Sequence, residues 1–347
     1  MHTIGKLKTP ILDVSGLTLS NGQRLIYTSR VMEECIREVH IFAPLNCDLL
    51  LRAETGTGKE LVARLTHDLS GRRGAFIAVN CAALPEQLVE DVLFGHARGA
   101  FTGATHQTSG AFEAAHQGTL FLDEFGDLRK SDQAKILRVL QEKTITKIGQ
   151  WGQEIPVDVR VIAATNADMP ATVQDGSFRL DLVHRFKKDI AIPPLRQRRG
   201  DISSLVAHFL DDFAGSHRVN DTFTLSPSAW TVLMSYDYPG NVRELEKIIF
   251  IAAAYVFASS SRVITDELLE NIIGAERWKR PSGSLAQTQV QIRETAPQIK
   301  ARHRQEWIAL LTQTLKDCKG DMHAAAKKLK MNYHAFFRNV KRHQLKT

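Results

Sequence analysis

The feature that most restricts the fold of this chain is a series of short apolar runs that alternate with longer segments of helical periodicity. The runs are DLLL (48–51), AFIAV (75–79), TLFLD (119–123) and VRVIAAT (159–165). A strand that is apolar along its whole length is buried on both faces, as in a parallel sheet covered by helices. We therefore predict an α/β fold with a doubly covered parallel sheet.

Prolines and composition divide the rest of the chain. Pro193 and Pro194 interrupt the alternation, because proline continues neither a strand ladder nor a helix. The predicted divisions are a short polar extension (1–22), the α/β domain (23–193), an all-α subdomain (194–275), a polar linker with scattered Pro, Gly and Ser (276–303) and a second helical segment (304–347).

Positive charge is concentrated near the C-terminus. The chain has 45 Lys+Arg and 38 Asp+Glu, of which residues 281–347 hold 13 and 4. This excess indicates a nucleic-acid-binding appendage on a nearly neutral body, with a merely solvated basic tail as the alternative.

Composition disfavours several other classes of protein. No apolar stretch approaches the roughly 18 residues that a membrane span requires, and the N-terminal segment lacks the apolar core of a signal peptide. We therefore expect a cytoplasmic protein. The four cysteines are scattered and form no CxxC pair, which disfavours a metal site built from them.

A glycine-rich turn between a predicted strand and a predicted helix is the first motif that carries chemistry. In such a turn, backbone N–H groups and the helix N-terminus face a phosphate, and a lysine adds positive charge. The sequence departs from G-x-x-x-x-G-K-[ST] at the first and last positions, so a chance glycine turn is the alternative. The residues of this phosphate loop are Ala53, Glu54, Thr55, Gly56, Thr57, Gly58, Lys59 and Glu60.

Two consecutive carboxylates end the run TLFLD and support the nucleotide interpretation. Asp123 is predicted to bind Mg²⁺ through its water, and Glu124 to polarise the attacking water. Acidic residues at a strand end can also be solvated caps. Their position after a phosphate loop in an α/β pattern favours hydrolysis of a nucleoside triphosphate.

Together these motifs resemble the AAA+ ATPases, and in particular the bacterial enhancer-binding proteins that activate the sigma-54 form of RNA polymerase. Eight segments carry the resemblance, in the order found in that family: ETGTGKE (54–60), VNCAAL (79–84), LFGHARGAFTGA (93–104), GTLFLDE (118–124), AATN (163–166), FRLDLVHRF (178–186), IPPLRQR (192–198) and YPGNVRELE (238–246). The resemblance implies an ATPase with a helical lid, with ATP and Mg²⁺ as ligands.

The resemblance also implies roles for five further residues. Asn80 matches the asparagine that restrains the catalytic glutamate, and Asn166 the sensor near the γ-phosphate. Arg179 and Arg185 match the arginines presented to a neighbouring subunit's ATP, which implies a homo- or hetero-hexamer. Ordinary surface arginines are the alternative for these two residues. Arg243 matches the sensor of the lid, and an ion pair with a nearby glutamate is its alternative.

The GAFTGA segment is the family's sigma-54-contacting loop. Glycines permit a tight turn here, and a phenylalanine at its tip gains nothing from burial unless a partner covers it. We expect Phe101 and Thr102 to be contact residues, with folding of Phe101 back onto its own domain as the alternative. The predicted sigma-54 contacts are Gly99, Ala100, Phe101, Thr102, Gly103 and Ala104.

The C-terminal segment resembles the Fis-type helix-turn-helix of the same family, which implies binding to enhancer double-stranded DNA. Asp321 and Lys330 depart from the usual asparagine and turn glycine, and a basic helical hairpin used for oligomerisation is the alternative. The predicted DNA-binding residues are Asn332, Tyr333, His334, Arg338, Lys341 and Arg342.

The leading hypothesis is therefore an ATP-driven activator that remodels the closed complex of sigma-54 RNA polymerase. A DNA-binding regulator whose ATPase is only a scaffold is a second hypothesis, and an AAA+ ATPase with another target is a third. Tyr27 and Ala53 replace glycines usual in the family, and Gln197 replaces a glutamate. Since only residues 1–22 precede the ATPase, we expect control by a separate inhibitory or co-activating protein, or by expression level.

Overall fold

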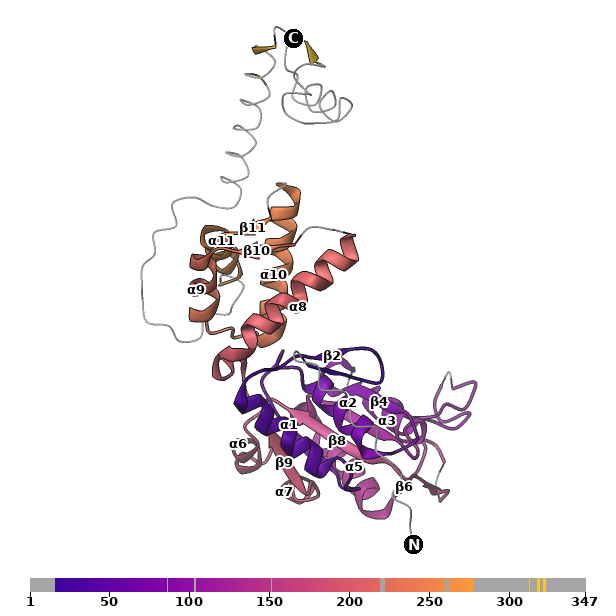
Figure 1. Ribbon diagram of the computed structural model, residues 1–347. Coiled ribbons are helices and arrows are strands. Elements are labelled where there is room, and N and C mark those ends of the chain that lie inside the picture. The colour runs from indigo at the N-terminus through magenta and orange to yellow at the C-terminus, as the bar shows by residue number, and fades with distance from the viewer. Residues whose placement is uncertain are drawn as a thin grey trace. The chain divides into compact units, whose positions relative to one another are not determined.

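Five parallel strands form the central sheet, in the order β4-β5-β8-β3-β9 (Figure 1). The computed structural model describes residues 16–85, 87–102, 104–150, 152–218, 222–259 and 262–277, with Thr312, Asp317, Cys318, Asp321 and Met322. The strands are β3 (Leu49–Arg52), β4 (Phe76–Asn80), β5 (Thr119–Asp123), β8 (Arg160–Thr165) and β9 (Lys188–Ala191). The predicted parallel sheet is confirmed, and four of its strands are those predicted.

Strand β9 was not predicted from the sequence. Its residues, KDIA, begin with two charged side chains, and Ile190 is the one that is buried. This strand lies at the edge of the sheet and pairs with β3 alone. An edge strand keeps part of its surface in water, so it lacks the continuous apolar character that marks the inner strands.

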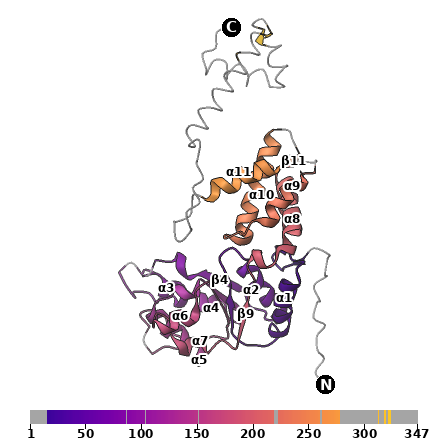
Figure 2. The same cartoon turned by 90° about the vertical axis from the view of Figure 1, so that its left-hand side faces the viewer.

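Helices cover both faces of the sheet, as Figure 2 shows. Because successive strand residues point to opposite faces, Leu49 and Leu51 pack under one set of helices and Leu50 under the other. One face carries α1 (Arg30–Phe42) and α2 (Lys59–Ser70); the other carries α3 (Val89–Phe94), α4 (Ala111–Ala114), α5 (Lys130–Glu142), α6 (Met169–Gln174) and α7 (Leu180–Val183). None of the helices in the described ranges is both long and apolar enough to cross a membrane.

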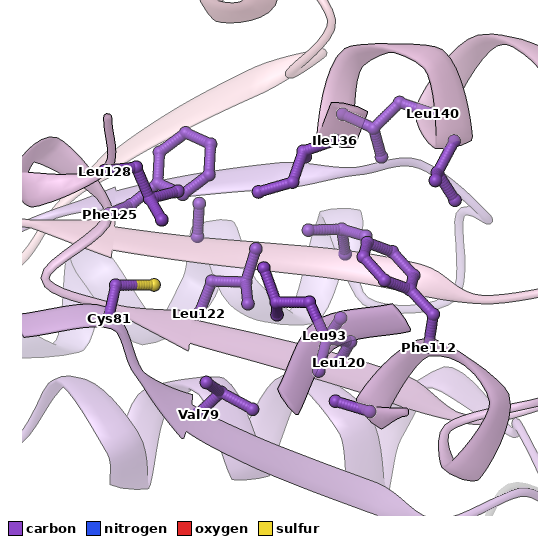
Figure 3. Packing of buried hydrophobic residues seen from close by; sticks show 14 of the residues in the cluster. Val79, Cys81, Leu93, Phe112, Leu120, Leu122, Phe125, Leu128, Ile136 and Leu140 are labelled. Carbon is purple, nitrogen blue, oxygen red and sulfur yellow. The ribbon is translucent and has the colours of Figure 1, made fainter. Parts of the chain in front are cut away.

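The larger core lies between the sheet and α3–α7. In Figure 3 the side chains of Leu120 and Leu122 on β5 face Leu93 of α3, Phe112 of α4 and Ile136 of α5. Strand β5 is thereby fixed between two neighbouring strands and a layer of helices. The carboxylates that follow it are consequently presented at one defined edge of the sheet.

A short hairpin precedes α1. Strands β1 (Leu17–Thr18) and β2 (Arg24–Leu25) pair in antiparallel fashion. Leu17 and Leu19 are buried in the same cluster as α1 and α2, so the packing of the α/β subdomain extends ahead of Gln23, where composition suggested its start.

A helical subdomain follows the sheet and has a second hydrophobic core. It contains α8 (Ile202–His217), α9 (Pro227–Ser235), α10 (Asn241–Ala258) and α11 (Asp266–Arg277), together with one parallel pair of short strands, β10 (Thr224–Leu225) and β11 (Val263–Ile264). Short 3-10 turns, η3 (Leu195–Gln197) and η4 (Arg199–Asp201), connect it to β9. The sequence predicted this helical character but not the small strand pair.

The start of α10 contacts the loop between β3 and α2 directly. The carbonyl oxygen of Gly56 accepts hydrogen bonds from the backbone N–H groups of Val242 (2.9 Å) and Arg243 (3.3 Å). A Cβ added to Gly56 would lie 2.3 Å from the carbonyl oxygen of Gly240, so only glycine permits this approach.

We predict that Gly56→Ala loosens α10 from the loop. Gly56 (φ +81°) and Gly22 (φ +85°) share the left-handed conformation, in which alanine costs about 1–2 kcal/mol, but nothing lies within 4 Å of a Cβ at Gly22. Hydrogen exchange at the Val242 amide should therefore accelerate in Gly56→Ala and stay unchanged in Gly22→Ala. Equal exchange rates in the two variants would contradict the importance of this contact.

Candidate functional site

The phosphate loop lies between β3 and α2, at the carboxyl end of the sheet. The Ala53 amide continues the sheet ladder by donating to the Thr165 carbonyl (3.0 Å), and the chain then turns through Gly56 and Gly58, both at positive φ. Gly58 caps α2 without any side-chain hydrogen bond. The first N–H groups of the helix are therefore available to an anion, which the helix dipole also favours.

Two side chains of the loop are engaged within it or along α2. The Thr57 hydroxyl donates to the Glu54 carbonyl (2.8 Å) and closes a turn. Glu60, at the position where serine or threonine is usual, forms an ion pair with Arg64 one helical turn away (3.3 Å).

Lys59 is held between the two predicted catalytic carboxylates. Its Nζ lies 3.0 Å from Asp123 Oδ1 and 2.9 Å from Glu124 Oε1, and the side chain is only 6% exposed. A buried ammonium group requires opposite charge close by, and here β5 supplies it to α2. Lys59 and Glu124 are 65 positions apart in the sequence, and the fold brings the lysine into contact with both carboxylates.

Glu124 has an unusual backbone and an unsatisfied oxygen. Its φ of +50° lies in the left-handed region, which costs a non-glycine residue about 1–3 kcal/mol and is found mainly at functional sites. Its Oε2 is buried and has no hydrogen-bond partner in the part of the chain that the structure describes, while Oε1 accepts from Lys59. Thr55 and Asn166 lie beside it: the Asn166 amide donates to Thr55 Oγ1 (3.2 Å), which is 3.5 Å from Glu124 Oε1.

Asn80 ends the strand next to β5 and pairs in register with Asp123. Its side-chain oxygen caps the short turn η1 (Cys81–Ala83) by accepting from the backbone N–H groups of Ala82 and Ala83. Burial, together with the nearby carboxylates of Asp123 and Asp127, raises the pKa of the Cys81 thiol to about 12. The surroundings of Cys81 at the end of β4 are thus negatively charged.

Arg179 and Arg185 flank α7 and are both exposed. The Arg179 guanidinium binds Asp181 through two hydrogen bonds (3.0 and 2.6 Å), and the Arg179 amide donates to the side chain of Gln133 on α5. In the described ranges neither arginine forms a hydrogen bond with the phosphate loop of its own chain.

Arg243 lies in the first turn of α10, and its backbone rather than its guanidinium contacts Gly56. A cavity of about 390 Å³ is lined by the β1–β2 hairpin, the phosphate loop, α8 and α10, to which α10 contributes Val242 and Glu246 rather than Arg243. Ile26 lines this cavity, whereas Tyr27 packs against the core under α1 and α2 and is not part of the wall.

Three residues of the connection to the lid contact the phosphate loop and were not singled out from the sequence. Buried Arg198 donates to the Thr57 carbonyl (2.7 Å), and Arg196 and Asn241 bind Glu54. They lie within IPPLRQR and YPGNVRELE, but nothing in those segments indicates a partner some 140 or more residues away.

The GAFTGA loop has a folded base and an exposed tip. Its ends approach closely at Gly95 and Gly110, where added Cβ atoms would meet backbone atoms at 2.4 Å. Near the tip the Gly99 amide donates to the Ala104 carbonyl (2.8 Å) and the Ala104 amide to the Phe101 carbonyl (3.0 Å). Gly103 lies outside the described residues.

The side chain of Phe101 is partly exposed and partly packed against its own domain. Its side chain is 48% exposed, and its ring contacts the edge of His96 with 4.9 Å between the centroids. His96 is buried and is held by Asp91 (2.6 Å) and the Thr108 hydroxyl (2.9 Å).

A second segment supports the loop from behind. Ile148, between β6 (Thr144–Ile145) and β7 (Ile155–Pro156), exchanges two 2.9 Å backbone hydrogen bonds with Gly95 and Ala97. A Cβ at Gly149 would lie 2.6 Å from the Cβ of Ala100, so the backbone at Gly149 packs against the Ala100 methyl group and leaves no room for a side chain.

The predicted DNA-binding residues, Asn332, Tyr333, His334, Arg338, Lys341 and Arg342, lie outside the described residues. In the described part of the chain, no group of three or more His, Cys, Asp or Glu side chains is arranged to hold a metal ion.

Comparison with known proteins identifies both subdomains. Residues 25–191 match the Sigma-54 interaction domain family, and residues 196–284 match the AAA+ ATPase lid domain. The Nif-specific regulatory protein of Herbaspirillum seropedicae is 42% identical over 305 residues, which cover 82% of this chain and 56% of that protein. The Sigma54-dependent transcriptional regulator SfnR of Pseudomonas fluorescens is 50% identical over 212 residues, covering 60% and 56%.

Solved structures agree with this identification. NtrX from Brucella abortus in complex with ATP superposes with a TM-score of 0.65 at 28% identity, over 91% of this chain and 68% of that one. The chain spans about half the length of curated relatives such as the Herbaspirillum protein. The resemblance seen in the motifs is thus confirmed, and the chain belongs to the sigma-54-dependent transcriptional activators of the AAA+ class.

Proposed function

We propose that this protein hydrolyses ATP and uses the energy to remodel sigma-54 RNA polymerase at promoters. The observation that carries the proposal is the Lys59–Asp123–Glu124 cluster beside an open helix N-terminus, in a chain that also presents a half-exposed Phe101. The charged cluster suits a triphosphate, and the exposed phenylalanine suits a protein partner. Residues 25–191, which match the Sigma-54 interaction domain family, contain both features.

The residues of the site fit MgATP. A magnesium ion bound with nucleotide takes one or two carboxylates plus phosphate oxygens, and Asp123 would provide such a carboxylate next to the loop. When bound, Mg²⁺ neutralises charge on the phosphates. Lys59 exchanges part of its pairing with the carboxylates for the phosphates, while the backbone N–H groups of the loop hold their oxygens.

Glu124 is the general base in this proposal. Its buried, unpartnered Oε2 has a lone pair available to orient a water and accept its proton. Asn166 and Thr55 form a short chain of hydrogen bonds to the same carboxylate and report the γ-phosphate position. Asn80, at the end of the neighbouring strand, restrains Glu124 between turnovers.

The proposal places each active site between two subunits of a homo- or hetero-hexamer. Arg179 and Arg185 are exposed and make no hydrogen bond with the phosphate loop of their own chain among the described residues, which suits delivery to a neighbour. An arginine supplied in this way accelerates phosphoryl transfer about 10³–10⁵-fold in well-studied enzymes. Arg243 acts from the lid of the same subunit.

The GAFTGA loop is proposed to contact sigma-54 through Phe101 and Thr102. Phe101 leaves about half of its surface uncovered and rests on His96, so a docking partner gains apolar area without an unfolding step. The basic C-terminal segment, with the predicted residues Asn332 to Arg342, is proposed to bind enhancer double-stranded DNA.

We predict that Glu124→Gln retains ATP binding but lowers kcat for hydrolysis by about 10²–10⁴-fold, because the base is lost while the shape is kept. Transcription from a supercoiled promoter with purified sigma-54 polymerase should stop as well. Glu142→Gln, an exposed glutamate on α5, is the control for a charge change. If Glu124→Gln still activates transcription, the protein is an assembly scaffold instead.

We predict that Phe101→Ala keeps ATP hydrolysis within about twofold of the wild type and abolishes capture of sigma-54 in the presence of a transition-state mimic. Truncating a hot-spot aromatic costs about 2 kcal/mol or more of binding energy. Leu88, which is equally exposed at 48%, gives the matched control Leu88→Ala. The contact assignment is wrong if both variants capture sigma-54 equally well.

A further inference from the structure

A single carboxylate of the phosphate loop connects the loop to two separate parts of the lid. Glu54 Oε2 accepts from Arg196 Nη1 (2.8 Å) and from Asn241 Nδ2 (3.1 Å), and Glu54 Oε1 accepts from Arg196 Nη2 (2.5 Å). Arg196 belongs to η3, the turn that leaves the sheet, and Asn241 is the first residue of α10. The paired Arg196 guanidinium lowers the pKa of Glu54, so the carboxylate stays ionised at neutral pH.

Asn241 is the hub of this arrangement. Its side chain donates to Glu54 and to the Thr55 carbonyl (3.1 Å), and its oxygen accepts from the Leu195 amide (2.8 Å). The residue is fully buried and has a φ of +54°, a conformation that asparagine tolerates better than most residues. The Asn241 side chain thus joins the start of α10 by hydrogen bonds to both the phosphate loop and the connecting turn η3.

The consequence is a fixed position for the start of α10. Val242 and Arg243 follow Asn241 directly, and their amides bind the Gly56 carbonyl. Arg243 has its backbone on the phosphate loop, and its exposed side chain extends from there. The orientation of its guanidinium toward a bound nucleotide therefore depends on the contacts that Asn241 and Glu54 make.

We propose that Glu54, Arg196 and Asn241 form a lid latch, in which Arg196 and Asn241 are positioning residues that hold α10 and Arg243 in the ATP-binding arrangement before nucleotide arrives. This inference rests on the ATP-binding part of the proposed function and is independent of sigma-54. The ion pair is partly exposed, since both side chains keep about 40% of their surface, so its contribution to global stability is small. The pair instead contributes geometry, because the two parallel hydrogen bonds from Arg196 to one carboxylate fix the orientation of η3 relative to the phosphate loop.

A latch of this kind has a specific kinetic signature. Apparent affinity falls in proportion to the fraction of molecules whose lid is already in place, while bound nucleotide restores the arrangement once it has entered. Loss of the latch should therefore raise KM for ATP and leave kcat nearly unchanged. A general structural defect would lower kcat and thermal stability together.

The test compares full-length Arg196→Gln with Arg199→Gln. Arg199 lies three residues on and also binds a carboxylate, but it does so with Asp237 inside the lid (2.7 Å). We expect Arg196→Gln to raise KM about tenfold, with kcat within about twofold, and Arg199→Gln to leave KM unchanged. Arg196→Lys, which keeps the charge without the planar fork, should restore part of the affinity.

A double-variant cycle tests whether Arg196 acts through Glu54. Glu54→Gln should raise KM at least as much as Arg196→Gln, since Glu54 also accepts from Asn241. Adding Arg196→Gln to Glu54→Gln should raise KM no further, because the ion pair between the two residues is already lost. Additive effects, or a KM for Arg196→Gln within twofold of the wild type, would overturn the latch.

Hydrogen exchange separates this inference from the proposed function. The Val242 amide should exchange faster in Arg196→Gln than in Arg199→Gln without any nucleotide present. If the wild type does not hydrolyse ATP, the proposed function fails, yet faster exchange at Val242 still supports the latch. Unchanged exchange in Arg196→Gln overturns it whatever the ATPase result.

Discussion

The interaction on which the rest of this structure depends is the contact of one buried ammonium group, Lys59, with two carboxylates that end a central strand. It joins the first turn of α2 to the end of β5 and so sets the geometry of the phosphate loop. Lys59 and the two carboxylates are tolerated at low exposure because they pair with one another, although one oxygen of Glu124 has no hydrogen-bond partner among the described residues. That oxygen and the left-handed backbone of the same residue are two costs to stability at one position.

Around this centre the fold is arranged in layers that meet at one edge of the sheet. The strands deliver Asn80, Asp123 and Thr165 to that edge, and the lid approaches it through Gly56 and Asn241. The phosphate loop is hydrogen-bonded to both parts: the Ala53 amide donates to the Thr165 carbonyl of β8, and the Gly56 carbonyl accepts from the Val242 amide of α10.

Much of this was predictable from the sequence, and the reasons for the exceptions are physical. Strand β8 is mostly apolar and is buried along its whole length, whereas the edge strand β9 carries Lys188 and Asp189 and is not recognisable in isolation. Lys59, Asp123 and Glu124 stand out because they occupy recognisable local patterns, a glycine-rich turn and the end of an apolar run. Arg196 and Asn241 do not, because their role arises from a partner 142 and 187 residues away and from a positive φ that no residue type reveals. The ring contact between Phe101 and His96 is likewise a tertiary contact that the segment GAFTGA does not reveal by itself.

The close approach of Gly149 to Ala100 has a mechanical consequence. The Ala100 methyl group occupies the space that a side chain at Gly149 would need, so the two segments meet without a gap. Together with the hydrogen bonds of Ile148 to Gly95 and Ala97, this contact ties the loop that carries Phe101 to the segment after β6, and neither can shift without disturbing the other.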